Sequence, residues 1–444
     1  MRSVRWIAAL VLVAFATTPV VASADDMSDA DMREQMQIMQ QRMKRMEDKL
    51  RDAERRAPAA PAAKGDCFFC SIEFEGWISA SYMWNTEGFD GINGQDLGGF
   101  NVGGGPTFPT TVYPFRPDHN SFSVDQVWLG MERPVSADQR AGFRLDFVFG
   151  KTADILNGRS DWFSGSQNDF HMYQAYIQYL APIGEGVEFK FGKFATLIGA
   201  EVVQSPSNYN ITRSNLFQLF QPITHTGIMA TASLWEGGTT SFGLVNETRS
   251  FPSRDIDINN NKALTWQVGH QINDMLFASF NGAWGDADSG SGFDTPSGDK
   301  EVIIDFVLNY DPNEKFSSYV NLDYLKNEGG TPLTPRGATE GWGIATAGRY
   351  ALTDKLGVSG RFEYTGLEFD SNDVNLLGLT GTVDYLLTGN LMVRGEVRYD
   401  QTLGGDITQV FFQSGGATRG VPGGGQEATA NNQVTLGAEV IYTF

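Results

Sequence analysis

The last fourteen residues of the chain, "NNQVTLGAEVIYTF" (431–444), alternate between apolar and polar side chains. The apolar face carries Val434, Leu436, Ala438, Val440, Tyr442 and Phe444. The polar face carries Gln433, Thr435, Gly437, Glu439 and Thr443, and only Ile441 interrupts it. A period of two places successive side chains on opposite faces of a β-strand. This stretch therefore predicts a strand with one apolar surface and one polar surface.

The same alternation recurs through most of the chain. Most of these segments have about ten residues, which is enough for a tilted strand to cross a bilayer. Sixteen segments show it, at roughly 72–84, 121–133, 141–150, 169–180, 187–195, 225–234, 240–247, 263–272, 275–285, 300–310, 316–326, 341–351, 356–368, 375–385, 391–401 and 433–443.

The connections between these segments alternate between short and long. The short ones lie near 134–140, 182–186, 235–239, 273–274, 311–315, 352–355 and 386–390, and the seventh long one, 369–374, is barely longer. Outer-membrane barrels combine short periplasmic turns with long external loops. A water-soluble β-sandwich also alternates, but it gives no reason for every second loop to be long. The sequence therefore predicts an all-β fold, a transmembrane antiparallel β-barrel of about sixteen strands over residues 71–444.

A barrel of this size leaves an aqueous channel, and its polar rows face the lumen. Charged residues on the predicted inward rows are Arg144, Asp146, Lys190, Asp305, Asp323, Arg349, Arg361, Glu363, Arg394, Glu396, Arg398 and Asp400. Charges that line a pore select ions by electrostatics. The same residues could instead pair with one another and only keep the lumen wet.

The long connection 196–224 contains apolar residues such as Leu216 and Phe220 that water would not favour. Two positions are open for it. It folds into the barrel and narrows it, which would place Glu201 and Arg213 near a constriction, or it packs against a neighbouring subunit.

Two segments precede the predicted linker and barrel. Residues 1–24 have a charged start, an apolar stretch and a final Ala-Ser-Ala, which is typical of a secretory signal peptide rather than a membrane anchor. Residues 25–56 carry a heptad seam, which predicts a coiled coil that joins subunits. We expect three subunits, by analogy with trimeric outer-membrane barrels that begin with similar zippers. An even strand count places this seam in the periplasm; alternatively, it is an amphipathic helix that lies on another envelope component. The seam consists of Met32, Met36, Met39, Met43, Met46 and Leu50.

Residues 57–70 form an Ala/Pro-rich linker that ends in the only two cysteines, Cys67 and Cys70. An exported chain meets an oxidising compartment, which favours a disulfide between them. A redox-active CxxC normally opens a helix in a thioredoxin-like unit, whereas this one precedes a strand. We therefore favour a structural role over a redox role.

Other chemistry lacks support in the sequence. A formal charge of −20 without a basic patch argues against a nucleic-acid partner. Neither a GxSxG nor an HExxH motif occurs. We expect no enzyme activity, no cofactor and no metal site.

Three stretches, "GFRLDFVFG" (142–150), residues 174–217 and "PITHTGI" (222–228), together resemble the OmpL-like β-barrel porin family of Gram-negative outer membranes. The block "GKFATLIGAE" (192–201) is the most specific part of this resemblance. The resemblance implies a barrel with porin activity, surrounded by outer-membrane lipid and lipopolysaccharide. Phe444 is similar to the C-terminal signal that the barrel-assembly machinery reads. The coiled coil is not a constant feature of that family, which leaves the subunit number open.

Two functions follow as hypotheses. The first is a water-filled diffusion channel in the outer membrane for small hydrophilic solutes or ions. The alternative is a structural outer-membrane protein with a plugged barrel, which links the membrane to the periplasm through its coiled coil.

Overall fold

The structure, a computed structural model, describes residues 71–86, 119–157, 169–249, 261–286, 300–327, 339–369, 372–403 and 432–444. The predicted signal peptide, the heptad seam, and Cys67 and Cys70 lie outside these residues. Within them, no helix is long and apolar enough to cross a membrane.

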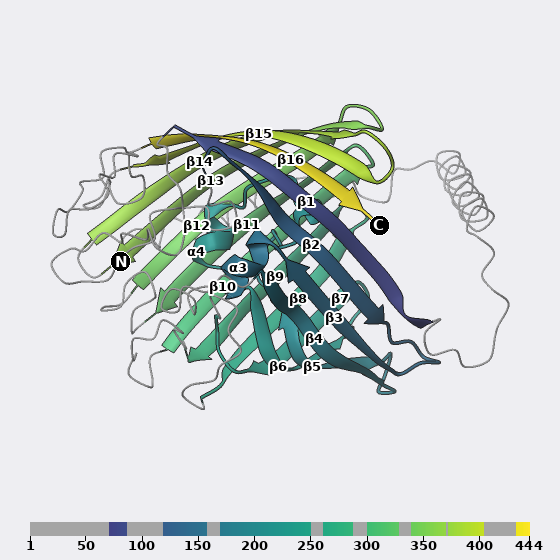
Figure 1. Ribbon diagram of the computed structural model, residues 1–444. Helices are drawn as coiled ribbons and strands as arrows, with labels where there is room; N and C mark the ends of the chain where they lie inside the picture. Colours follow the sequence, from purple (N-terminus) through teal and green to yellow (C-terminus); the bar gives the residue numbers. More distant parts are fainter. Residues whose placement is uncertain are drawn as a thin grey trace, which may run out of the picture. The chain divides into compact units, whose positions relative to one another are not determined.

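The described residues form sixteen antiparallel strands in one closed barrel (Figure 1). Consecutive strands pair with each other, and the first strand pairs with the last to close the barrel. The predicted antiparallel barrel is therefore confirmed. The strands are β1 (Glu73–Asn85), β2 (Ser121–Arg133), β3 (Ala141–Phe149), β4 (Phe170–Ala181), β5 (Val187–Ala195), β6 (Thr224–Ala232), β7 (Gly238–Val245), β8 (Ala263–Asn273), β9 (Leu276–Asp286), β10 (Lys300–Asn313), β11 (Phe316–Asn327), β12 (Thr339–Ala351), β13 (Leu356–Phe369), β14 (Asn372–Leu386), β15 (Leu391–Thr402) and β16 (Asn432–Thr443).

The alternation of the last strand separates the interior of the barrel from its outer face. Val440 and Tyr442 are 46 % and 47 % exposed on the outer face, whereas Glu439 is 1 % exposed. Glu439 accepts a hydrogen bond of 2.7 Å from the Ser79 hydroxyl of β1. The apolar row therefore faces outwards and the polar row faces inwards, as the period of two predicts.

Two details of the connections differ from the prediction. The expected long loop 369–374 is wrong at both ends, because β13 extends to Phe369 and β14 begins at Asn372. The expected loop 151–168 begins with a helix, α3 (Lys151–Asn157). Ile155 and Leu156 of α3 are buried and belong to one apolar cluster with Trp128 and Tyr173. This helix is stabilised by packing rather than by its own length, because isolated helices need about 12–15 residues.

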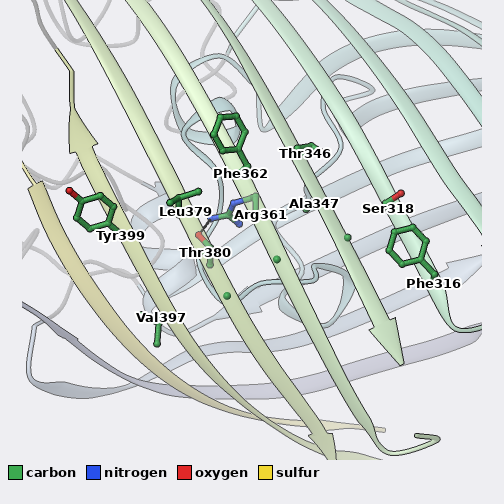
Figure 2. Close-up of a pocket in the computed structure, with 13 residues that line it drawn as sticks. Phe316, Ser318, Thr346, Ala347, Arg361, Phe362, Leu379, Thr380, Val397 and Tyr399 are labelled. Atoms are coloured by element: carbon green, nitrogen blue, oxygen red, sulfur yellow. Dashed lines mark hydrogen bonds between the residues drawn. The ribbon is translucent and has the colours of Figure 1, made fainter. Parts of the chain in front are cut away.

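The outer face has a depression of about 780 Å³ over β11–β15 (Figure 2). Gly348, Gly360 and Gly381 lie directly opposite one another on β12, β13 and β14. Because these residues have no side chains, the floor of the depression is backbone. Phe316 and Phe362 are among the aromatic residues that line it.

The seam between β1 and β16 depends on a close contact at Gly76. The Gly76 N–H donates to the Phe444 carbonyl at 3.1 Å, and the Phe444 N–H donates to the Gly76 carbonyl at 2.9 Å. A Cβ atom at Gly76 would lie 2.5 Å from Cε2 of Phe444 and 2.8 Å from the carbonyl oxygen of Trp128. Only glycine fits here without a shift of the terminal ring and the neighbouring backbone.

We expect Gly76→Ala to destabilise the barrel by about 1–3 kcal/mol, the usual effect of overpacking. Gly395→Ala is the matched control, because nothing lies within 4 Å of a Cβ at that position of β15. Thermal unfolding in detergent, followed by heat-dependent mobility on SDS gels, compares the two variants. Equal melting temperatures would show that the seam tolerates a side chain at Gly76.

Candidate functional site

The connection between β5 and β6 lies inside the barrel, and we call residues 196–223 the inserted segment. It contains a short 3-10 helix, η2 (Ser205–Ser207), and the helix α4 (Asn215–Leu219). Ser214 caps α4, because its hydroxyl accepts a hydrogen bond of 3.1 Å from the Phe217 N–H. In Figure 1, α4 is drawn among the strands of the barrel, and it contacts β12 and β13.

Apolar side chains hold the inserted segment against the wall of its own barrel. Ile198, Leu216 and Phe220 are buried and form one cluster with Tyr319 and Leu325 of β11. This burial removes the apolar surface from water, which is the main favourable contribution to such packing. Of the two positions that the sequence left open, the structure therefore shows the one inside the barrel.

Charged residues of β13, β15 and β16 form a wall beside the inserted segment, which we call the charged wall. It consists of Arg361, Glu363, Arg394, Glu396, Arg398, Asp400 and Glu439. Arg398 is paired with Glu363 at 3.0 Å and with Asp400 at 2.8 Å. Arg361 pairs with Glu363 at 3.2 Å, and Arg394 pairs with Glu439. Every member is buried, and each of the three arginines is paired with at least one carboxylate.

The carboxylates of the charged wall bind the backbone of the inserted segment. Glu396 accepts hydrogen bonds from the Ile211 N–H at 2.6 Å and from the Thr212 N–H at 3.0 Å. Glu363 accepts the N–H of Asn215 at the start of α4. Hydrogen bonds to an ionised acceptor are roughly twice as strong as neutral ones. The wall thus supplies partners for the N–H groups of the irregular backbone at Ile211 and Thr212 and of the first residue of α4.

The arginines of the charged wall donate hydrogen bonds to backbone carbonyl groups of the inserted segment. Arg361 donates to the Thr212 carbonyl and Arg398 donates to the Arg213 carbonyl, each at 2.6 Å. Arg394 donates to the Asn208 carbonyl at 2.8 Å. Figure 2 shows that Arg361 also reaches Thr380 of β14, at 3.2 Å.

Glu201 and Arg213 belong to the inserted segment itself. Glu201 pairs with Arg361 at 2.8 Å and accepts the Ser214 N–H at 2.6 Å. Burial raises the pKa of the Glu201 carboxyl, but Arg361 and Ser214 outweigh it and hold the pKa below its usual 4.5. Arg213 donates to the carbonyls of Val202 and Val203 at 2.7 and 2.8 Å. Both residues therefore stabilise an irregular backbone.

The structure places all the sequence-predicted charged residues on the interior side of the barrel, in three groups. Eight of them surround the inserted segment: Glu201, Arg213, Arg361, Glu363, Arg394, Glu396, Arg398 and Asp400. Asp305 and Asp323 form a separate buried pair on β10 and β11. The third group lies near the strand ends that meet the short connections, within about six residues of them, and consists of Arg144, Asp146, Lys190 and Arg349.

The last group retains contact with water, except for Asp146. The side chains of Arg144, Lys190 and Arg349 are 20 %, 27 % and 33 % exposed. Arg144 pairs with Glu132 at 2.8 Å and with Asp146 at 2.9 Å. Lys190 lies 3.6 Å from Glu188. These charges are accessible from the end of the barrel that carries the short turns.

Several carboxylates that pair with the predicted arginines were missing from the predicted set. The alternation of polar and apolar residues along their strands could have identified them. Glu439 lies on the polar face of the last strand, and Asp384 and Glu132 also lie on inward rows. Their partners come from other strands, and a sequence does not show which rows meet. Among the described residues, no group of three or more His, Cys, Asp or Glu side chains is arranged to hold a metal ion.

Comparison with known proteins adds a family and a set of similar folds. A family model described as "Putative beta-barrel porin-2, OmpL-like" matches residues 71–444. No curated protein matches the chain.

Three solved structures illustrate the similarity of the fold. The trimer form of in-vitro folded OmpT from Vibrio cholerae has a TM-score of 0.53 and 12 % identity, and the match covers 84 % of this chain and 99 % of that one. An anion-selective porin from Comamonas acidovorans has a TM-score of 0.51, 12 % identity and the same coverage. The outer membrane channel DcaP of Acinetobacter baumannii has a TM-score of 0.50 and 10 % identity, with 84 % and 97 % covered. At these identities, the similarity concerns the fold alone.

We expect Arg398→Met to loosen the inserted segment, because it leaves Glu363 and Asp400 without their shared cation. Breaking a buried ion pair on one side typically costs about 3–5 kcal/mol. Thermal unfolding measures the loss, and mass spectrometry after trypsin treatment measures cleavage at Arg213, which is 2 % exposed in the folded chain.

Arg349→Met is the matched control for Arg398→Met, because Arg349 is partly exposed and, among the described residues, pairs with one carboxylate, Asp384. We expect a smaller loss of stability and no new cleavage at Arg213. If both variants released Arg213 to trypsin equally, the charged wall would not be what holds the segment.

Proposed function

Because the chain belongs to the OmpL-like family of β-barrel porins, we propose that its barrel carries small hydrophilic solutes or ions across the outer membrane. The observation that supports this most directly is a closed antiparallel barrel with apolar residues outside and charged residues inside. A closed barrel leaves no free edge in the bilayer, and a barrel of about sixteen strands is wide enough for an aqueous passage.

We propose different roles for the predicted pore-lining charges. The exposed group, Arg144, Lys190 and Arg349, lies where solutes meet the interior from the short-turn end. The buried group around the inserted segment keeps that segment in place and so sets the width of the passage beside it. Ion preference would then depend mainly on the exposed group, since exposed pore charges act directly on passing ions.

One observation favours the alternative function, a structural protein with a plugged barrel. The side chains of Arg361 and Arg398 are 0 % exposed, so the inserted segment leaves no open water at the charged wall. The two functions differ in one measurable property, which is conductance.

We expect the purified chain to give stepwise single-channel currents in planar bilayers. Lys190→Glu should shift the reversal potential in a salt gradient towards cation preference, because it replaces a basic charge beside Glu188 with an acidic one. Lys315→Glu, in the short turn between β10 and β11, is the control and should leave the reversal potential unchanged. Correctly inserted protein without currents would support the plugged structural barrel instead.

We also propose that three chains assemble and that the heptad seam of residues 32–50 joins them in the periplasm. One of the compared structures, OmpT of Vibrio cholerae, is described as a trimer. Three heptads are marginal for an isolated helix, but barrels that associate would hold the seams at high local concentration. In the sequence, Cys67 and Cys70 lie between the heptad seam and the barrel, and we expect a local disulfide between them.

We expect deletion of residues 27–56 to reduce the size of the detergent-solubilised oligomer in light scattering. The wild-type chain, purified in the same detergent, is the reference. An unchanged size would favour the alternative in which this helix lies on another envelope component.

Contacts with lipid, lipopolysaccharide and the assembly machinery belong to the same proposal. The outer face carries exposed apolar residues such as Phe242 and Val397, which suit a lipid environment. Phe444 is 58 % exposed and stacks on Tyr442 at the end of the last strand. An exposed terminal aromatic ring is accessible for recognition during assembly.

A further inference from the structure

Two aspartates lie opposite each other in the wall of the barrel, away from the charged wall. Asp305 of β10 and Asp323 of β11 are direct cross-strand neighbours and are 0 % and 4 % exposed. Neither forms an ion pair with a basic side chain of the described residues. Like charges directly opposite each other are destabilising, and burial of unpaired carboxylates is costly. Something must therefore balance this pair.

Amide groups surround the pair but carry no charge. The Asn321 Nδ2 donates to Asp305 Oδ2 at 2.6 Å and to Asp323 Oδ1 at 3.0 Å, so one nitrogen joins the two carboxylates. Asn281 of β9 also donates to Asp305. The Gly199 N–H of the inserted segment donates to Asp305 Oδ1 at 3.1 Å. These bonds orient the carboxylates without neutralising them.

Three buried oxygens at this place accept no hydrogen bond from an N–H or hydroxyl group of the described residues: Asp323 Oδ2, Asn281 Oδ1 and Gln221 Oε1. Gln221 is 3 % exposed and comes from the inserted segment rather than from the wall. Its Nε2 donates to the Asn321 Oδ1 at 3.0 Å, which places its amide beside the two carboxylates.

The backbone of the inserted segment fixes the position of this amide. Gly199 has a φ of +95°, and a Cβ there would lie 2.0 Å from the Gln221 Nε2 and 2.1 Å from its Oε1. A glycine at this position lets the amide lie directly against the backbone. The segment therefore holds the Gln221 amide, including its Oε1, against its own backbone.

We propose that Asp305, Asp323, Asn281 and Gln221 bind a hard divalent cation of the Ca²⁺ type. Such a cation takes carboxylate and amide oxygens, and its charge balances two carboxylates. A single proton shared by the two carboxylates gives a hydrogen bond to only one of the three oxygens. A cation can instead be coordinated by all three. The absence of imidazole and thiolate ligands among these four residues disfavours softer transition metals.

The bound cation joins the inserted segment to the wall at β9–β11. The charged wall at β13–β16 holds the same segment from other strands. Removal of the cation therefore leaves the segment attached through the charged wall and weakens its attachment at Gln221 and Gly199.

The test uses the full chain, refolded into detergent free of lipopolysaccharide and stripped with EDTA. Calorimetric titration with CaCl₂, and separately with MgCl₂, measures stoichiometry and affinity. We expect one Ca²⁺ per chain, with weaker Mg²⁺ binding because Mg²⁺ demands a more regular coordination. We also expect a melting temperature that falls in EDTA and returns with Ca²⁺.

Three variants locate the site. D305N/D323N removes both carboxylates, and Gln221→Leu removes only the oxygen from the inserted segment, which keeps the test valid if the double variant does not fold. Each should weaken Ca²⁺ binding by more than roughly tenfold, since even groups that only orient metal ligands are worth that factor. Asp311→Asn, an exposed carboxylate at the end of the same strand, is the control and should bind as wild type does.

Two results would overturn the proposal. One is Ca²⁺ binding that is equal in wild type, Gln221→Leu and Asp311→Asn. The other is a wild-type melting temperature that does not change with EDTA or Ca²⁺, together with a higher melting temperature for D305N/D323N than for wild type. That result would show that a shared proton, not a cation, balances the two carboxylates. Neither measurement depends on conductance, so the proposal of a cation site can be refuted without refuting the proposed channel function, and the reverse.

Discussion

The structure depends on one requirement: within a bilayer, every backbone N–H and C=O group needs a partner inside the protein. Sixteen antiparallel strands meet it by pairing each strand with two neighbours, and the pairing of β1 with β16 removes the last free edge. The period of two follows from the same requirement, because each strand then has one face towards lipid and one towards the interior. The composition of the chain reflects this division along nearly its whole described length.

The interior poses the same problem in another form. The inserted segment has only two short helices, so most of its backbone lacks regular partners. Irregular backbone at membrane depth is tolerated where protein surrounds it. Here the partners are mainly charged side chains: Glu396 and Glu363 accept its N–H groups, and Arg361 and Arg398 serve its carbonyls. The charges inside this barrel therefore act as structural elements as well as electrostatic ones.

The strands could be predicted because their pattern is local. Each residue of "NNQVTLGAEVIYTF" reveals its face through its immediate neighbours, and the same holds for Arg394 and Arg398 on the strand before it. The partners of these residues could not be predicted, since Arg398 meets Glu363 and the Arg213 carbonyl through contacts that no local pattern encodes. Helix α3 escaped prediction because seven residues show no clear period and packing on Trp128 stabilises them. The amides of Asn321 and Gln221 gave no signal at all, because a polar side chain on an inward row is ordinary until its neighbours are known.

The contact between Ser79 and Glu439 spans 360 positions of the sequence. A ribosome makes the chain in order, so β1 exists long before its second neighbour does. Until β16 is available, every intermediate sheet has two unpaired edges, and such edges invite pairing with other chains. A partial sheet of this barrel never has the complete pairing that the closed barrel has. Protection of the incomplete sheet against pairing with other chains is therefore as much a requirement of this protein as the sequence that closes the barrel.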